Sequence, residues 1–347
     1  MTERGAGVEV VGAPEVPGLR FRLYAGPGDI PALAAVRNAA WLADGVDETL
    51  SEEALASDLS HAEPARWIPE RDLVVVEIDG RVVGWSWRDI RVEPSGVRIL
   101  CHRGQLLPEV RRRGIGTALL RHNEAALLAR AEPAGDVRGP GPAWLDSFTM
   151  AGMTGAATLY AKEGYRPARY FFKMVRPTLD DPPEVALPAS LEIRPVCTPG
   201  DVRRVLRAVD DAFRDHWGYL EATEEDDRHV LEDPRQDVGL WQVAWDGNEV
   251  AGFVLPLVDQ ADNAAFGRRC AWLDAIGVRV PWRRQGVARA LIGASLRVLR
   301  DRGLDSAVLD VDSENETGAL GLYERTGFAV TSRITVWRKE VVFTEGG

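Results

Sequence analysis

A short run of basic and small residues, Arg283-Arg284-Gln285-Gly286-Val287-Ala288, has the chemistry to bind a pyrophosphate. Apolar residues follow it at helical spacing, which predicts that the run forms the first turn of a helix. Backbone N–H groups in a first turn lack intrahelical partners, and the helix macrodipole is positive there. Gly286 and Ala288 leave space for phosphate oxygens, and Arg283 and Arg284 add cationic donors.

A second copy of this pattern, Arg111-Arg112-Arg113-Gly114-Ile115-Gly116, occurs 172 residues earlier in the chain. Roughly one such match is expected by chance in a chain of this length and composition. However, Pro27-Gly28-Asp29 and Pro199-Gly200-Asp201 are also 172 residues apart, and Tyr160 precedes Tyr323 by 163 residues. Two ordered sets of matching features predict an internal duplication.

The elements around each turn must hold it in place. Before the second turn, the run from Leu273 to Val280 predicts a strand, and residues 307–311 predict the next one. Asn315 is then predicted to open a helix that carries Tyr323, whereas residues 258–268 read as a loop. Because strands alternate with helices in both halves, the sequence predicts an α/β fold in which helices cover a sheet.

The length of 347 residues suggests two domains. We predict a flexible tail over residues 1–18, an N-terminal domain over 19–176, a stiff proline-rich linker over 177–190 and a C-terminal domain over 191–347.

Composition excludes several classes of function. The net charge of −11 argues against nucleic-acid binding, and no apolar run is long enough to span a membrane. The N-terminus lacks a hydrophobic signal core, so we predict a cytoplasmic protein. Cys101, Cys197 and Cys270 are far apart and have no metal-ligand spacing, so no metal is expected. Acidic residues gather at 210–227, where a solvated face is a more common explanation than a rim that attracts a cationic amine.

At both turns, and at the tyrosines that follow them, the sequence resembles the GNAT superfamily of acyl-CoA-dependent N-acetyltransferases. The tandem layout is similar to that of mycothiol synthase-like actinobacterial proteins, and the resemblance covers both halves. It implies two tandem GNAT-like domains, each with a mixed central sheet whose central strand splays from its neighbour and is flanked by helices. It also implies acetyl-CoA as the co-substrate.

By this resemblance, backbone groups of the splayed strand bind the pantetheine arm of the cofactor, and the turn binds its pyrophosphate. In the C-terminal half these roles fall on Ile276, Val278, Val280, Arg283, Arg284, Gly286, Val287, Ala288 and, at the start of the last helix, Asn315. In the N-terminal half the corresponding residues are Leu106, Arg111, Arg113, Gly114 and Gly116.

Transfer of an acetyl group to an amine requires a base for the amine proton and an acid for the leaving thiolate. No Ser-His-Asp set is visible, which favours direct transfer without an acyl-enzyme. The resemblance assigns the acid to Tyr323 and places a glutamate base where this chain has Trp272. Asp274 shares a strand face with Trp272 and is the predicted substitute. A hydrogen-bonded structural carboxylate and a core tyrosine are the structural alternatives.

The predicted acceptor site comprises Trp272 and the run Asp215-His216-Trp217, which follows the first helix of the second half. A lone histidine more often makes a structural hydrogen bond than a ligand contact. The first half lacks a counterpart of Asn315 and carries His102 on its central strand. We therefore expect this half to be degenerate or structural, with acyl-CoA binding as a possible remnant, and we expect catalysis in the second half.

The sequence thus predicts an enzyme that moves an acetyl group from acetyl-CoA directly to a primary amine of a small molecule, as a monomer or homodimer. A protein lysine or N-terminal acetyltransferase is one alternative, and it would favour an open peptide groove. A non-catalytic acyl-CoA-binding regulatory protein is the other.

Overall fold

The computed structural model describes residues 5–131, 141–315 and 318–343. The chain forms two compact units, and each is described by itself. The N-terminal unit comprises Met1–Ala168 and Thr335–Gly347, and the C-terminal unit comprises Arg169–Ile334. These bounds differ from the expected domains because two strands, β6 (Arg166–Arg176) and β12 (Ala329–Val341), each begin in one unit and end in the other.

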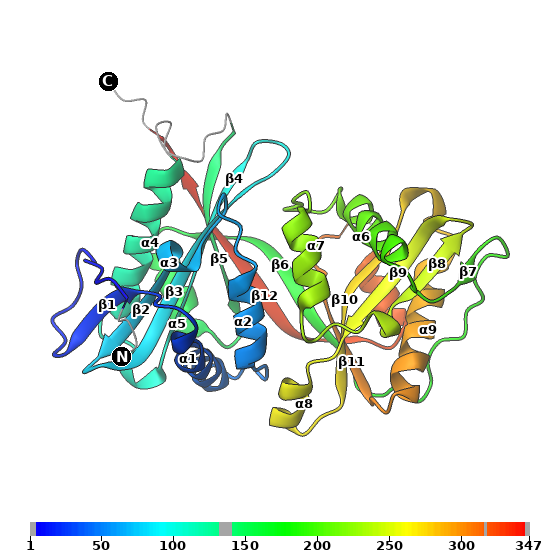
Figure 1. Ribbon diagram of the computed structural model, residues 1–347, viewed down its shortest axis with the longest axis horizontal. Coiled ribbons are helices and arrows are strands. Elements are labelled where there is room, and N and C mark those ends of the chain that lie inside the picture. Colours follow the sequence, from blue (N-terminus) through cyan, green and yellow to red (C-terminus); the bar gives the residue numbers. More distant parts are fainter. Residues whose placement is uncertain (1–4, 132–140, 316–317, 344–347) are drawn as a thin grey trace. The chain divides into compact units, whose positions relative to one another are not determined.

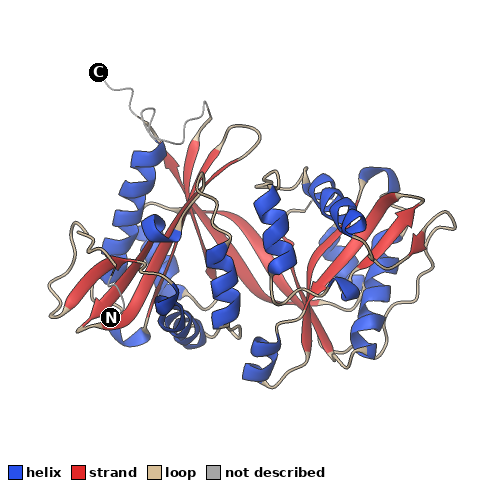
Figure 2. Cartoon of the chain, viewed as in Figure 1, coloured by secondary structure: helices blue, strands red, loops and turns tan. Residues whose placement is uncertain are grey.

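The N-terminal unit is a mixed sheet with the strand order β1-β2-β3-β4-β5-β12, flanked by helices (Figures 1 and 2). Its elements are β1 (Leu19–Leu23), α1 (Ile30–Ala43), α2 (Glu52–Ser60), α3 (Pro69–Asp72), β2 (Leu73–Ile78), β3 (Arg81–Val92), β4 (Arg98–Leu106), α4 (Ile115–Ala131), β5 (Ala143–Met150) and α5 (Thr154–Lys162).

The C-terminal unit repeats this plan, with the strand order β12-β6-β11-β10-β9-β8-β7. Its elements are β7 (Glu192–Ile193), α6 (Pro199–Phe213), α7 (Glu224–Glu232), β8 (Gln242–Asp246), β9 (Glu249–Leu257), α8 (Gln260–Phe266), β10 (Cys270–Val278), α9 (Val287–Asp301), β11 (Ser306–Asp312) and α10 (Ala319–Arg325).

The central strand of each unit splays away from its parallel neighbour. In the C-terminal unit β10 pairs with β11 only over Cys270–Trp272, although it stays paired with β9 as far as Val278. In the N-terminal unit β4 pairs with β5 only over Arg98–Cys101, and it stays paired with β3 to Leu106. The expected fold class is therefore confirmed, because both units have a mixed sheet with a splayed central strand.

Several local expectations need correction. Residues 258–268 contain the helix α8, because Asp259 caps its first turn by accepting from the Asp262 N–H and Gly267 ends it in the left-handed region. The last helix of the C-terminal unit begins at Ala319 with Gly318 as its N-cap, so Asn315 lies in the turn after β11.

The segment expected to be a flexible tail is packed against the N-terminal unit from Gly5 onward. The Val8 N–H donates to the Phe21 carbonyl at 2.9 Å, and the Leu23 N–H donates to the Ala6 carbonyl at the same distance. Val10 is 6% exposed and belongs to the hydrophobic core. The segment therefore acts as an additional edge of the sheet beside β1.

The proline-rich stretch 177–190 is likewise packed rather than free. Leu179 is buried in the core around α9, and the Pro183 carbonyl lies against Gly293 on that helix. A Cβ atom at position 293 would collide with this carbonyl oxygen. The glycine therefore lets the chain between the two halves dock on α9.

We expect Gly293→Ala to lower the free energy of unfolding by about 1–3 kcal/mol. The new methyl group would displace the docked chain, and the cost of this displacement should exceed the roughly 1 kcal/mol gained in helix propensity. Gly155→Ala on α5 is the matched control, since a Cβ there has no described atom within 4 Å. Urea unfolding of both variants measures the difference. Equal stabilities would show that the docked position of Pro183 contributes little.

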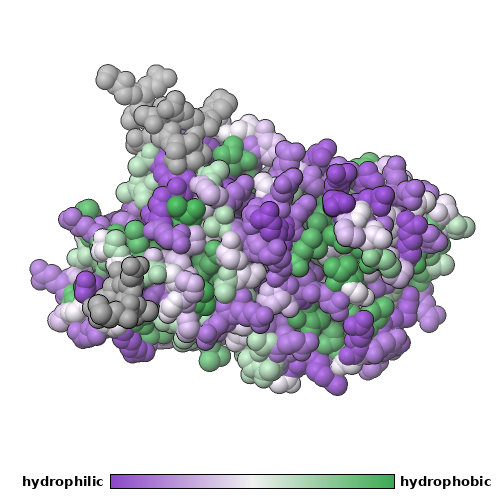
Figure 3. All heavy atoms as spheres, viewed as in Figure 1, coloured by the Kyte–Doolittle hydropathy of each residue, from purple (hydrophilic) through white to green (hydrophobic). Residues whose placement is uncertain are grey.

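The exposed large apolar side chains of the described residues, among them Val11, Leu42 and Val280, come from separate parts of the chain. The face in Figure 3 is mostly hydrophilic, with separate hydrophobic areas between the polar ones. In the described part of the chain, no helix has the length and apolar character needed to cross a bilayer.

Candidate functional site

The phosphate turn of the C-terminal unit has the geometry that the sequence predicts. Gly286 is the N-cap of α9 and has φ 82°, a left-handed conformation that favours glycine. No side chain caps this helix, and the Ala290 N–H donates the first bond back to Gly286. A Cβ at Gly286 would meet no described atom within 4 Å. The N–H groups of Val287 and Ala288 thus head an open helix start.

The leading arginine of each turn has a positioning role that the sequence does not reveal. Arg283 donates from Nε to the Val278 carbonyl at 2.9 Å and from its guanidinium to the Ala212 carbonyl at 3.2 Å. Arg111 makes the same pair of bonds, to Leu106 at 3.0 Å and to Ala40 at 3.1 Å. These arginines tie the end of the splayed strand to the preceding helix, and the matching contacts support the internal duplication.

The second arginine of each turn is held in an uncommon backbone conformation. Arg284 has φ 61° and Arg112 has φ 62°, both in the left-handed region that non-glycine residues seldom adopt. Such backbone strain is frequent at functional sites. No hydrogen bond or ion pair engages the Arg284 side chain among the described residues, so this guanidinium is the one available for an anion.

The predicted contacts with the cofactor arm lie along the splayed part of β10. Ile276 and Val278 pair with β9, and the opposite edge of the strand no longer pairs with β11. The Val278 carbonyl is already used by Arg283. Val280 lies beyond the strand in a 3₁₀ turn, and its side chain is 61% exposed.

A β-bulge in β10 distinguishes the two units. The pairing of β10 with β9 shifts between Leu273 and Ala275, so Asp274 is an extra residue without its own partner. In the N-terminal unit the pairing of β4 with β3 runs from Arg98 to Leu106 with no shift. Bulges occur next to active sites, where they redirect a side chain. Only the C-terminal unit therefore presents a carboxylate in this way.

The bulge changes which residues correspond between the units. Leu106 lies five residues after Cys101, the last residue of β4 paired with β5. Val278 lies six residues after Trp272, the last residue of β10 paired with β11. On the N-terminal side of the bulge, His102 therefore corresponds to Leu273. Asp274 itself has no counterpart in the N-terminal unit. His102, which the sequence places on the central strand of the first half, therefore does not occupy the position of Asp274.

Asp274 combines solvent access with a raised pKa. Its side chain is exposed, yet the surrounding protein desolvates it enough to raise the pKa of the carboxyl above its usual value. The charge of Arg235 opposes this shift, and that of Asp233 adds to it. An accessible carboxylate with a raised pKa suits proton abstraction.

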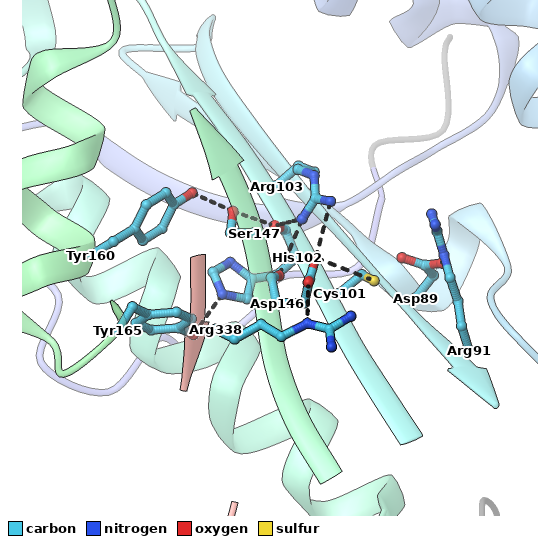
Figure 4. Close-up of polar contacts among 10 residues, drawn as sticks. All are labelled: Asp89, Arg91, Cys101, His102, Arg103, Asp146, Ser147, Tyr160, Tyr165 and Arg338. Carbon is cyan, nitrogen blue, oxygen red and sulfur yellow. Dashed lines mark hydrogen bonds and ion pairs between the residues drawn. The ribbon is translucent and has the colours of Figure 1, made fainter. Parts of the chain in front are cut away.

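The two corresponding tyrosines are both buried but have different surroundings. The Tyr160 and Ser147 hydroxyls are hydrogen-bonded to each other at 2.6 Å, and His102 lies 2.7 Å from the Tyr165 hydroxyl (Figure 4). Burial lowers the pKa of His102 to about 3, so its imidazole is neutral. In the N-terminal unit the Tyr160 hydroxyl is therefore part of a buried polar cluster.

Around Tyr323 this polar cluster is replaced by apolar residues. Leu273, Leu309 and Phe328 belong to the core that surrounds Tyr323, and the Phe328 ring lies 6.2 Å from the tyrosine ring. No hydrogen bond engages the Tyr323 hydroxyl among the described residues. Burial raises the pKa of Tyr323 to about 12. This phenol is therefore neutral at physiological pH and retains its proton for donation.

The predicted acceptor residues are only partly brought together. Trp217 lies against Phe171 on β6 with ring centroids 6.3 Å apart, whereas the Asp215 carboxylate lies 3.9 Å from Arg283 of the phosphate turn. His216 contacts the Phe213 ring, and burial lowers its pKa. Trp272 lies on the paired part of β10, with the Lys173 ammonium 5.2 Å from its ring.

The N-terminal unit contains a cavity of about 360 Å³ between the splayed strand, α4 and α5. It is lined by Leu106, Arg111, Gly114 and Gly116, which the sequence predicts as cofactor contacts, together with His102 and Tyr160. Its volume falls within the usual range of ligand pockets. Arg113, the remaining predicted contact, is exposed and does not line it.

Two features of the site were missed from sequence. The sequence signal for the bulge is Pro256 on β9, which pairs with Leu273 of β10. A proline has no N–H to donate to a regular ladder of hydrogen bonds between strands. The bond between Ser147 and Tyr160 has no signal in the spacing of these residues. Among the described residues, no group of three or more potential ligands is placed to hold a metal ion.

Comparison with known proteins identifies the family. The model of the "Acetyltransferase (GNAT) family" matches residues 204–328, and that of the "Acetyltransferase (GNAT) domain" matches residues 69–167. The mycothiol acetyltransferase of Geodermatophilus obscurus is 32% identical over 321 residues, which are 90% of this chain and 95% of the relative. The mycothiol acetyltransferase of Thermobispora bispora is 30% identical, over 94% of this chain and 99% of the relative.

Solved structures agree with these matches. A GCN5-related N-acetyltransferase from Sphaerobacter thermophilus aligns with a TM-score of 0.69 and 28% identity over 93% of this chain and 95% of that one. A tandem GNAT protein from the clavulanic acid biosynthesis pathway aligns with a TM-score of 0.67 over 94% of this chain and 100% of its own. At 19% identity, the latter shows the shared fold alone. The chain therefore belongs to the GNAT family of acyl-CoA-dependent N-acetyltransferases and carries one GNAT domain in each half.

Proposed function

We propose that this enzyme transfers an acetyl group from acetyl-CoA to a primary amine of a small molecule, and that the chemistry takes place in the C-terminal unit. The observation that carries this proposal is the bulge at Asp274, which the N-terminal unit lacks. A small-molecule acceptor is supported by the relatives, which are named mycothiol acetyltransferases and align over nearly their whole length.

The phosphate turn and the splayed strand would hold the cofactor. The helix start at Gly286 has space and N–H donors for a pyrophosphate, and Arg284 adds a cation. The unpaired edge of β10 after Trp272 offers backbone groups to the amides of the pantetheine arm, including the N–H of Val278. Arg283 serves as a positioning residue here, since its bonds fix the strand end relative to the turn.

When bound, acetyl-CoA supplies an activated acetyl thioester. Asp274 would accept the proton of the acceptor ammonium, directly or through a water molecule, so that the amine can attack. Tyr323 would donate its phenolic proton to the departing thiolate. Both groups suit these roles, because one is an accessible carboxylate with a raised pKa and the other a neutral phenol whose hydroxyl has no partner among the described residues.

The proposal is tested by a panel of amines with acetyl-CoA, in which release of free thiol is followed. The panel includes the amine acceptor of mycothiol acetyltransferases, amino sugars, amino acids and a lysine peptide. We expect turnover with a small amine. Turnover with the peptide alone would favour a protein acetyltransferase, and thiol release without any amine would mean hydrolysis. The cytoplasmic location and the monomeric or homodimeric state stay predictions.

Asp274→Asn is expected to lower kcat/KM about tenfold at neutral pH and to remove an acid limb from its pH profile. Asp274 must be ionised to act as a base, so the rate of the wild type should fall as the pH drops through its pKa. Desolvation raises this pKa, so the limb should lie above the usual carboxyl range. An unchanged profile in the variant would exclude Asp274 as the base.

A further inference from the structure

The last strand of the first half of the chain lies mostly in the C-terminal unit. Residues 169–176 of β6 belong to that unit, where the strand pairs with β11. Side chains alternate along a strand, and Phe172 and Met174 pack in the core around α9. Phe171 and Lys173 therefore face the other side of the sheet. The first half of the chain thus supplies side chains to the face of the C-terminal sheet that points away from α9.

Two β6 side chains hold Trp217, which lies in the loop after α6. The Phe171 ring is 6.3 Å from the Trp217 ring, and the Arg169 guanidinium is 5.7 Å from it. Arg169 is itself fixed, because it donates to both carboxylate oxygens of Asp312 at 2.8 to 3.1 Å and to Glu314 at 2.7 Å. A guanidinium bound in this way has little freedom to move. The loop that carries Trp217 is therefore docked on a rigid part of β6.

The next β6 side chain on this face reaches the second predicted acceptor tryptophan. The Lys173 ammonium lies 5.2 Å from the Trp272 ring. Phe171 and Lys173 are two residues apart, which is about 7 Å along a strand. The two indoles predicted for the acceptor site therefore lie against neighbouring side chains of β6. Asp274, the proposed base, is two residues beyond Trp272 on β10.

The same face of the N-terminal unit has a different character. Its central strand has Cys101 in the place of Trp272, because each is the last residue paired with the parallel neighbour. On that neighbour, Asp146 forms ion pairs with Arg103 at 3.4 Å and with Arg338 of β12 at 3.1 Å (Figure 4). Ion pairs thus occupy the face that carries indoles in the C-terminal unit.

We propose that β6 forms one wall of the acceptor site in the C-terminal unit. Arg169 and Phe171 are positioning residues for Trp217, and Lys173 is a positioning residue for Trp272. The acceptor then places its ammonium at Asp274 and its carbon frame against the indoles. Aromatic rings bind best to a flat apolar face, so the wall selects amines carried on a ring over linear ones. The inference rests on the proposed function, which places the amine at Asp274.

The test compares two amino alcohols, D-glucosamine, which has a ring, and ethanolamine, which has none. We expect the wild type to favour D-glucosamine in kcat/KM. Phe171→Ala should lower this preference about tenfold, as the loss of an aromatic contact does, and should leave acetyl-CoA affinity unchanged. Lys173→Ala should lower the preference in the same direction. A ratio between two amines does not depend on the folded fraction, because both are measured on one preparation.

Phe172→Ala is the matched control, because Phe172 is the next residue on the strand and faces the core. It should lower the melting temperature at least as much as Phe171→Ala and keep the wild-type preference. Phe171→Tyr keeps the ring and should keep the preference too. Backbone hydrogen exchange over residues 214–222 needs no acceptor, and it should be faster in Phe171→Ala than in Phe172→Ala.

Equal preferences in Phe171→Ala and the wild type, or an equal loss in Phe172→Ala, would overturn the proposal. So would hydrogen exchange over residues 214–222 that stays slow in Phe171→Ala, or a wild type that acetylates other amines of the panel but not D-glucosamine. A wild type that acetylates no amine contradicts the proposed function instead, so the two failures are distinguishable.

Discussion

Gly286→Glu is expected to abolish acetyl-CoA binding by the C-terminal unit, with affinity weakened at least about 100-fold, or about 2.7 kcal/mol. The substitution places a carboxylate at a helix start whose N–H groups and positive dipole favour an anion. The new charge would occupy the space of the pyrophosphate and repel it. Calorimetry with acetyl-CoA measures the loss, and unchanged stoichiometry and affinity would refute the assignment of this turn.

A control must separate the charge from backbone strain, because Gly286 has φ 82° and any side chain there is strained. Gly303→Glu provides it. Gly303 follows the other end of α9, has φ 85° and would also place a Cβ in open space. Both variants should lose similar stability on heating, but only Gly286→Glu should lose acetyl-CoA binding.

Much of the fold could be predicted because the duplication makes each half a check on the other. The repeat of the arginine and glycine turn locates the helix start in both halves, and the apolar runs before it locate the central strands. The structure has strands and helices at these places, and even the φ angles of Arg112 and Arg284 agree within a degree. Patterns of this kind can be recognised in the sequence because they depend on local backbone geometry.

The features that separate the halves were harder to predict, because they depend on contacts distant in sequence. The bulge at Asp274 is set by pairing with β9, and a one-residue insertion in a strand leaves the apolar pattern nearly unchanged. Likewise, the segment before β1 is held by Val10 in a core formed mostly by residues beyond position 19. A proline in β9 is a local sign of the bulge, whereas the packing of the segment before β1 has no comparable sign.

The difference between the halves can be stated in chemical terms. In the N-terminal unit the tyrosine hydroxyl is bonded to Ser147, and the strand has no bulge. In the C-terminal unit Leu309 lies at the position of the serine, because Val308 pairs with Trp272 as Asp146 pairs with Cys101. The bulge there adds Asp274. Both differences favour the C-terminal unit as the place of catalysis.

Tyr323→Phe is accordingly expected to lower kcat at least about tenfold with little change in acetyl-CoA affinity. Removing a positioned general acid typically costs about 10²–10⁴-fold, and the lower bound allows for a water molecule as substitute donor. The phenylalanine ring keeps the packing against Phe328, so the fold should persist. Because burial raises the pKa of Tyr323 to about 12, the wild type should show no loss of rate from this group between pH 7 and pH 10.

Tyr160→Phe is the matched control for this prediction, since it removes the same atom from the corresponding position. The Tyr160 hydroxyl is bonded to Ser147, so its loss should cost about 1 kcal/mol of stability and leave kcat nearly unchanged. Steady-state kinetics and melting temperatures of both variants separate a chemical from a structural role. If Tyr323 is only a core residue, its variant should keep a normal kcat. If it is the acid, kcat falls in Tyr323→Phe alone, because only its hydroxyl has no partner in the described part of the chain.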